Sequence, residues 1–141
     1  MIIAVDFDGT IVTHEYPKIG KEIPFAITTL KRLQDDFQHL LILWTVREGV
    51  ELDEAVEFCK SRGLEFYAVN SNYPDKIAND TQPRKLKADL FIDDRNLGGL
   101  PDWGVVFQMI STEKHLEPYS NELPNEYPPQ KKGFFKTLFG E

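Results

Sequence analysis

The feature that most constrains this chain is a short apolar run near its start that ends in an acidic turn. Residues 2–7 read Ile-Ile-Ala-Val-Asp-Phe, and Asp8, Gly9 and Thr10 follow directly. An apolar run of this length, bounded by a polar turn, is typical of a parallel strand that is buried on both faces. We therefore expect the first strand of a parallel sheet at Ile2–Phe7, with acidic residues at its carboxyl end.

Strands and helices are expected to alternate along the following residues. Apolar residues recur every three to four positions in 24–37 and in 51–62, which predicts two amphipathic helices. Further apolar runs predict strands at 40–45, 66–69, 89–92 and 105–109. This alternation predicts an α/β fold, a three-layer α/β/α sandwich around a mostly parallel, Rossmann-like sheet with right-handed crossovers. A short helix is also expected around 75–79.

A change of composition after Ser111 divides the chain into two parts. Residues 1–111 are expected to form one domain, and 112–141 a Pro-rich tail that is extended or partly ordered. The tail ends in a small apolar patch between lysines, formed by Phe134, Phe135, Leu138 and Phe139. Packing on the protein's own body is the first expectation for this patch. Self-association into a homo-oligomer and contact with a membrane are the alternatives.

Charge and cysteine content exclude several classes of function. The 141 residues carry a formal net charge of -7, which argues against a general nucleic-acid surface. Cys59 is the single cysteine, so an internal disulfide or a cysteine-based metal site is excluded. The sequence shows neither a basic leader nor an apolar run long enough to span a membrane. We expect a cytoplasmic protein.

Polar residues follow three of the predicted strands at the point where each strand ends. They are Asp6 and Asp8 after the first strand, Thr45 and Arg47 after the second, and Asp93, Asp94 and Arg95 after the fourth. The carboxyl ends of parallel strands form the ligand crevice of such sheets. Carboxylates gathered there repel one another, so a cation is expected among them. Because the donors are oxygens, with no His or Cys, Mg²⁺ is favoured over zinc.

In order along the chain, these residues resemble the four motifs of the haloacid dehalogenase (HAD) superfamily of phosphohydrolases. Asp6-Phe7-Asp8-Gly9-Thr10 resembles the first motif and Thr45 the second. Lys85 is placed like the third, and Asp93-Asp94 resembles the fourth. The motifs together cover residues 2–95. The resemblance implies that residues 1–111 are a HAD-like catalytic domain with the activity of a magnesium-dependent phosphatase.

The resemblance also implies a role for each motif residue. Asp6 is the expected nucleophile, forming an aspartyl-phosphate, and Asp8 the expected general acid and base. Thr45 is expected to hydrogen-bond the phosphoryl group, and Lys85 to offset its charge. Lys76 and Lys87 are alternatives to Lys85. The expected metal ligands are Asp6, Asp8 through its backbone carbonyl, Asp93 and Asp94.

Three further residues are expected to bind substrate. Gly9 and Thr10 would let backbone N–H groups approach the phosphate, as in other glycine-rich phosphate loops. Arg47 would clamp a phosphate, or would instead pair with a neighbouring acid. Arg95, at the exit of the fourth strand, has the same two alternatives as Arg47. His14 and Tyr16 are left out of the expected site, because exposed loop residues of these types commonly have no catalytic role. Trp44 and Cys59 are interpreted as packing residues.

The substrate expected for this site is a small phosphate ester. Segments 11–23 and 70–84 are too short to form a sizeable cap domain, so the site should be open. Residues 88–95, Ala-Asp-Leu-Phe-Ile-Asp-Asp-Arg, resemble the same segment of deoxyribonucleotidases in this superfamily, which favours a nucleotide. Two alternatives are a weak or inactive HAD-like module that binds or regulates a partner, and a receiver-like signalling domain. The second is disfavoured because its phosphorylated aspartate lies in the middle of the chain.

Overall fold

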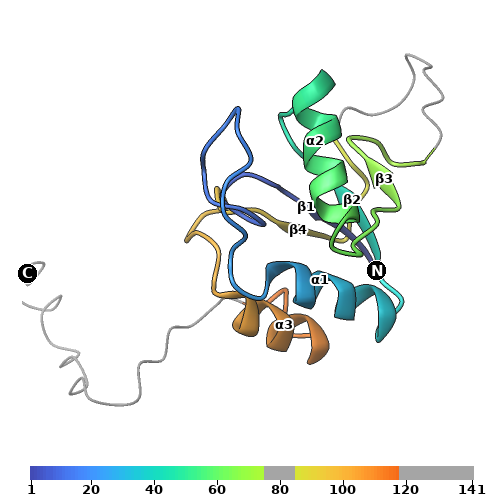
Figure 1. Ribbon diagram of the computed structural model, residues 1–141. Helices are drawn as coiled ribbons and strands as arrows, with labels where there is room; N and C mark the ends of the chain where they lie inside the picture. Colours follow the sequence, from blue (N-terminus) through green and yellow to red (C-terminus); the bar gives the residue numbers. More distant parts are fainter. Residues whose placement is uncertain (75–84, 118–141) are drawn as a thin grey trace, which may run out of the picture.

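The computed structural model describes residues 1–74 and 85–117 and shows an α/β fold (Figure 1). Along the chain the elements are β1 (Ile2–Val5), α1 (Ala26–Asp35), β2 (Leu40–Leu43), α2 (Gly49–Lys60), β3 (Ala68–Val69), β4 (Leu90–Ile92) and α3 (Trp103–Ser111). The first four predicted strands are confirmed, each shorter than the apolar run that predicted it. Both predicted amphipathic helices are confirmed as well. The short helix expected around 75–79 lies outside the described residues.

The strands of the described residues form one parallel sheet in the order β3-β2-β1-β4. Val5 pairs with Leu43 on one side and with Ile92 on the other, so the last residues of β1, β2 and β4 lie side by side. In Figure 1 the blue loop after β1 and the yellow segment after β4 leave the sheet at the same end. The polar residues that follow these strands are thereby brought to one edge of the sheet.

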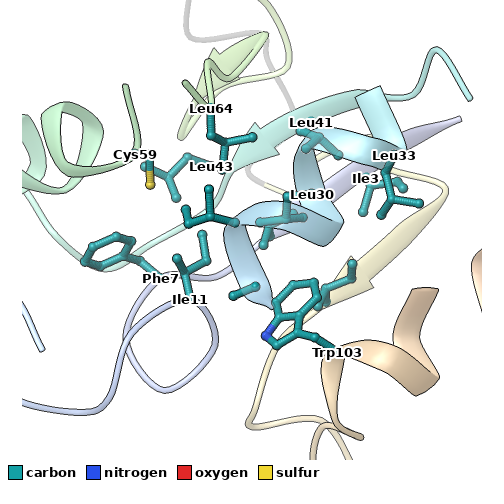
Figure 2. Close-up of a cluster of buried hydrophobic side chains, with 14 of the residues drawn as sticks. Ile3, Phe7, Ile11, Leu30, Leu33, Leu41, Leu43, Cys59, Leu64 and Trp103 are labelled. Carbon is teal, nitrogen blue, oxygen red and sulfur yellow. The ribbon is translucent and has the colours of Figure 1, made fainter. Parts of the chain in front are cut away.

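The helices α1, α2 and α3 all pack against one face of the sheet. Alternate strand residues point to this face, among them Ile3, Val5 and Leu43, and they join side chains of all three helices in one buried cluster. Figure 2 shows this cluster, which extends from Cys59 of α2 to Trp103 of α3. The crossovers from β1 to β2 and from β2 to β3 run in the same direction. Right-handed crossovers therefore place α1 and α2 on the same face.

On the opposite face of the sheet, a described part of the segment between β3 and β4 packs against the strands. Ala4, Ile42 and Ala68 belong to this face, and Leu86 packs with them in a second buried cluster. Residues 75–84 of the segment lie outside the described residues. The parallel α/β sheet is thus confirmed, whereas the third layer of the predicted sandwich stays a prediction.

The predicted fifth strand at 105–109 is wrong, because these residues belong to helix α3. The carboxylate of Asp102 caps the helix by accepting hydrogen bonds from two backbone N–H groups of the first turn, at 2.9 and 3.2 Å. The buried residues of the helix are spaced for one helical face: Trp103, Val106 and Ile110. An apolar run alone does not distinguish a buried strand from a buried helix. In this segment the helical conformation is stabilised by the Asp102 cap and by packing against α1.

Helix α3 ends at Ser111, where the sequence predicted the end of the domain. The described residues end at Glu117, so the terminal aromatic patch lies outside them. Across residues 1–74 and 85–117, no helix has the length and apolar character needed to cross a membrane.

Candidate active site

Three carboxylates meet where β1 and β4 end. Asp6 follows β1, Asp93 and Asp94 follow β4, and one oxygen from each lies within 4.8 Å of the others. The backbone accounts for this approach, because the N–H of Asp6 donates to the carbonyl of Ile92 at 2.9 Å and continues the pairing of the two strands. The structure thus brings together the side chains of three of the four expected metal ligands. We call these three residues the acidic cluster.

The acidic cluster is electrostatically unfavourable without a ligand. Burial raises the pKa of Asp6 to about 6, and the charges of Asp93 and Asp94 add to this rise. In addition, Oδ1 of Asp94 is buried and has no hydrogen-bond partner among the described residues. A cation would offset the repulsion and give this oxygen a partner. An all-oxygen donor set of this kind fits Mg²⁺.

Thr10 is a buried residue that connects two members of the acidic cluster. Its hydroxyl donates to Oδ2 of Asp6 at 3.2 Å and accepts from the backbone N–H of Asp94 at 3.1 Å. Its carbonyl accepts the indole N–H of Trp103 at 3.0 Å. The residue is fully buried. Thr10 thus positions two acids of the cluster, and its backbone N–H donates to the carbonyl of Phe7 at 3.3 Å. The expected approach of this N–H to a phosphate stays a prediction.

Gly9 has a backbone conformation that favours glycine, with φ at +87°. A Cβ atom at this position would collide with the side chains of His14 and Asp94. The N–H of Gly9 donates to the carbonyl of Val12 at 2.6 Å, so the loop itself uses the group that was expected to face a phosphate. Gly9 therefore allows the chain to turn tightly beside the cluster.

Asp8 lies apart from the acidic cluster and forms a buried ion pair with Arg47. Nε of Arg47 donates to Oδ2 of Asp8 and Nη2 donates to Oδ1, each at 2.7 Å. The exposed fractions are 6% for Asp8 and 0% for Arg47. Two parallel, charge-assisted bonds fix both the distance and the orientation of the carboxylate. The bond to Asp8 is also the main reason that the pKa of Arg47 is raised.

The guanidinium of Arg47 also donates to the loop that follows β1 and to the carbonyl of Glu51 in α2, the latter at 3.5 Å. Its Nη1 donates to the carbonyl of Pro17 at 2.9 Å, and its Nη2 donates to that of Lys18 at 2.8 Å. The guanidinium lies 5.1 Å from the ring centre of Phe7 and 5.2 Å from that of Tyr16. The expectation of a substrate-binding Arg47 is therefore corrected. Its alternative, pairing with a neighbouring acid, is what the structure shows.

A pocket of about 410 Å³ opens beside the acidic cluster. A few polar groups converging in such a pocket are typical of a site for a small molecule. Its lining comes from the ends of β1, β2 and β4 and from the loop after β1: Asp6, Asp8, His14, Tyr16, Trp44, Thr45, Val46, Asp93 and Arg95.

Five of the lining residues are absent from the site predicted from the sequence: His14, Tyr16, Trp44, Val46 and Arg95. Trp44 and Arg95 lie at strand ends, the signal that selected the predicted residues, and this signal could have selected them too. His14 and Tyr16 come from the loop after β1, and Nε2 of His14 lies 2.9 Å from Oδ2 of Asp94. The path of that loop depends on Arg47, a contact that a local pattern does not show.

Thr45 lies in the pocket wall at the end of β2, as predicted. Its backbone N–H donates to Oδ1 of Asn70 at 2.8 Å, and its Oγ1 accepts from the N–H of Arg47 at 3.2 Å. Both bonds fix the residue beside the acidic cluster. Among the described residues the hydroxyl hydrogen has no acceptor, so it can donate to a ligand.

The predicted catalytic lysine does not line this pocket. Lys85 is exposed, and its Nζ lies 5.8 Å from the ring centre of Phe91. Lys87 is also exposed, and its backbone N–H donates to Oδ1 of Asn72 at 2.7 Å. Lys76 lies outside the described residues. Among the lining residues found in the described chain, the basic group is Arg95 rather than a lysine.

Fold and site together define a parallel α/β protein with an acidic, metal-compatible pocket at the strand ends. The chain resembles the solved structure of a conserved protein from Bacteroides thetaiotaomicron, with 64% sequence identity and a TM-score of 0.77. The match covers 81% of this chain and 92% of the other. The chain therefore belongs to the family of this conserved protein. No family model and no curated protein matches the sequence.

Proposed function

We propose that the protein is a magnesium-dependent phosphohydrolase of the HAD type that works through an aspartyl-phosphate on Asp6. The observation that carries this proposal is the meeting of Asp6, Asp93 and Asp94 beside a pocket at the carboxyl ends of the strands. The three side chains offer oxygen ligands, and Asp6 also faces the pocket. A carboxylate placed in this way serves as a nucleophile towards phosphorus.

Asp6, Asp93 and Asp94 would hold the Mg²⁺ ion, and the motif resemblance adds the backbone carbonyl of Asp8. When bound, Mg²⁺ supplies positive charge that stabilises the phosphoryl group during transfer. Thr10 holds Asp6 and Asp94 close to each other by a hydrogen bond to each residue. The protein's own contribution is thus a fixed set of oxygens whose mutual repulsion is relieved on binding.

The chemistry proposed for the chain's own residues has two displacements. An oxygen of Asp6 attacks phosphorus, and the leaving group departs. Water then attacks the aspartyl-phosphate, with Asp8 beside it in the pocket wall to accept a proton. The hydroxyl of Thr45 and the guanidinium of Arg95 are the groups placed to bind phosphoryl oxygens.

The pocket supports a small phosphate ester as substrate. Its volume of about 410 Å³ suits a small molecule, including a nucleotide. Its outer wall is formed by His14 and Tyr16 from a short loop. Such a wall takes the place of a cap domain, consistent with the proposed HAD-like fold of the capless type.

A HAD-like module with weak or no activity is the second candidate. The observation that favours it is that Lys85 is exposed and does not line the pocket. With no lysine lining the pocket among residues 1–74 and 85–117, one source of charge stabilisation for phosphoryl transfer is lost there. Such a module would still bind Mg²⁺ through the acidic cluster.

The test is hydrolysis of 4-nitrophenyl phosphate and a panel of phosphate esters, with and without Mg²⁺. We expect Mg²⁺-dependent release of phosphate from the wild type and its loss in Asp6→Asn. Asp53→Asn, which changes an exposed acid on α2, is the matched control and should keep full activity. Binding of Mg²⁺ without hydrolysis of any ester would contradict the proposal and favour the second candidate.

A further inference from the structure

The pocket beside the acidic cluster has a polar and an apolar part. Asp6 and Thr45 belong to the polar part, where the phosphoryl group of a substrate is proposed to bind. Tyr16, Trp44 and Val46 line the same pocket and come from the loop after β1 and from the end of β2. We call these three residues the apolar wall.

Two residues of the apolar wall are unusually exposed for their type. The exposed fraction is 58% for Tyr16 and 79% for Val46. A single exposed apolar side chain needs no explanation, but apolar side chains gathered beside polar groups in a pocket are typical of a surface that binds a ligand. Because the wall is continuous with the pocket that holds Asp6, the ligand that fits both is the phosphate ester itself.

The two aromatic rings of the wall are held in position by the rest of the chain. The guanidinium of Arg47 lies over the ring of Tyr16, 5.2 Å from the ring centre, and donates to the carbonyls of the two residues that follow Tyr16. The backbone N–H of Trp44 donates to the carbonyl of Val5 at 2.8 Å, and its side chain packs against the second buried cluster. Groups that are already fixed lose little conformational freedom when a ligand binds.

We propose that Tyr16 and Trp44 determine which esters the site accepts, by stacking on an aromatic ring in the alcohol part of the substrate. The substrate class is phosphate monoesters whose alcohol carries a flat aromatic ring, nucleoside monophosphates among them. Flat rings gain more on aromatic side chains than saturated groups of the same size, because their faces and edges make favourable electrostatic contacts. This inference rests on the proposed function and narrows its substrate class.

The stacked ring belongs to the leaving group and takes no part in the bonds that form and break. The two displacements at Asp6 therefore stay as proposed, and the wall acts on substrate binding. Binding energy that is equal in the bound substrate and in the transition state lowers KM without changing kcat. We therefore expect the wall to change KM for esters with a ring and to leave kcat nearly unchanged.

The first test compares benzyl phosphate with cyclohexylmethyl phosphate, using the wild-type, full-length protein with Mg²⁺. Both esters release a primary alcohol of nearly the same size, so they differ mainly in the flatness of the ring. Stacking on two aromatic side chains should make kcat/KM for benzyl phosphate at least ~5-fold higher than for cyclohexylmethyl phosphate. A smaller ratio would overturn the inference.

Variants of Tyr16 then separate stacking from a merely structural role. Tyr16→Phe keeps the ring and should keep the ratio of the two esters. Tyr16→Leu keeps an apolar side chain but loses the ring, so the ratio should fall at least ~2-fold through a higher KM for benzyl phosphate. Tyr73→Leu is the matched control, because Tyr73 is also exposed and does not line the pocket. It should leave the ratio unchanged.

Trp44→Leu tests the second ring in the same way. Trp44 also packs against the sheet, so this variant is expected to lose stability. The ratio of kcat/KM for two esters does not depend on the fraction of the protein that is folded, so it remains a valid measure. It should fall at least ~2-fold.

The contrary outcomes are distinct from a failure of the proposed function. If either leucine variant of the wall keeps the wild-type ratio, or if Tyr16→Phe loses it, that side chain does not stack on the substrate and the inference is wrong. Equal, Asp6-dependent hydrolysis of both esters would leave the phosphohydrolase standing and contradict the substrate class alone. Absence of Asp6-dependent hydrolysis of every ester, 4-nitrophenyl phosphate included, would instead contradict the proposed function on which the inference rests.

Discussion

Asp6 and Asp8 are two residues apart in the same turn, yet the structure gives them opposite surroundings. Asp6 faces two further acids, and its pKa is raised to about 6 by burial first and by these charges next. Asp8 faces Arg47, which binds both of its oxygens. One acidic turn thus carries both an acid placed for a ligand and an acid fixed by an ion pair. Asp6, which has no cationic partner among the described residues, is the acid placed for a ligand, whereas Asp8 is fixed in position by its ion pair.

The largest expected effect is on the paired acid. Arg47→Met should lower the free energy of unfolding by about 3–5 kcal/mol, because it leaves the Asp8 carboxylate buried without a cation. Arg32→Met is the control, since Arg32 pairs with Asp36 on the surface at 3.0 Å and its loss should cost less than about 1 kcal/mol. Urea unfolding measures both values. Equal losses would contradict the difference between the buried and the exposed pair.

The next effect concerns the acidic cluster. At a Mg²⁺ concentration one hundred times its Kd, wild type should gain about 2.7 kcal/mol of stability. Asp93→Asn should lose most of this gain, whereas Asp53→Asn should keep it. Thermal unfolding with and without Mg²⁺ gives the comparison. A gain that survives in Asp93→Asn would show that the ion binds elsewhere.

A smaller effect is expected at the turn that separates the two acids. Gly9→Ala should cost about 1–3 kcal/mol, because the new methyl group meets His14 and Asp94 at a positive φ. Gly49→Ala is the control for φ alone, since Gly49 also has a positive φ but open space around it. Denaturant midpoints of the two variants separate strain from collision. Equal costs would mean that the collision contributes nothing.

The smallest effect is expected at Trp103, which contacts the acidic cluster through Thr10. Trp103→Phe removes the indole N–H that donates to the carbonyl of Thr10 and should cost about 1 kcal/mol. Because Thr10 binds Asp6 and Asp94, the affinity for Mg²⁺ should fall as well. Calorimetric titration with Mg²⁺ measures this. An unchanged affinity would show that the cluster keeps its geometry without Trp103.

The sheet and the acidic cluster could be predicted from the sequence because both depend on short, local patterns. A buried parallel strand is a continuous apolar run, and the residue that follows it lies at the ligand edge of the sheet. Asp6, Asp93 and Thr45 were found by this rule alone. α3 was missed because an apolar run fits a strand as well as a helix, and the signal that distinguishes them, the cap at Asp102, lies before that run.

The surroundings of Arg47 could not be predicted, because they depend on contacts distant in sequence. The sequence left two alternatives for this residue, a phosphate clamp and an ion pair. The choice is made by the carbonyls of Pro17 and Lys18 and by Asp8, which lie 29 to 39 residues before it. Lys85 was expected from its spacing before β4, but spacing along a loop does not fix the direction of an exposed side chain.

The most direct test of the central claim is to look for the phosphoryl group on Asp6. The protein is incubated with acetyl phosphate and Mg²⁺, quenched in acid, digested and analysed by mass spectrometry. The account predicts one phosphoryl group on the peptide that contains Asp6, dependent on Mg²⁺ and absent in Asp6→Asn. Hydrolysis of acetyl phosphate with no phosphoryl group on that peptide, or with the group on another residue, would contradict it.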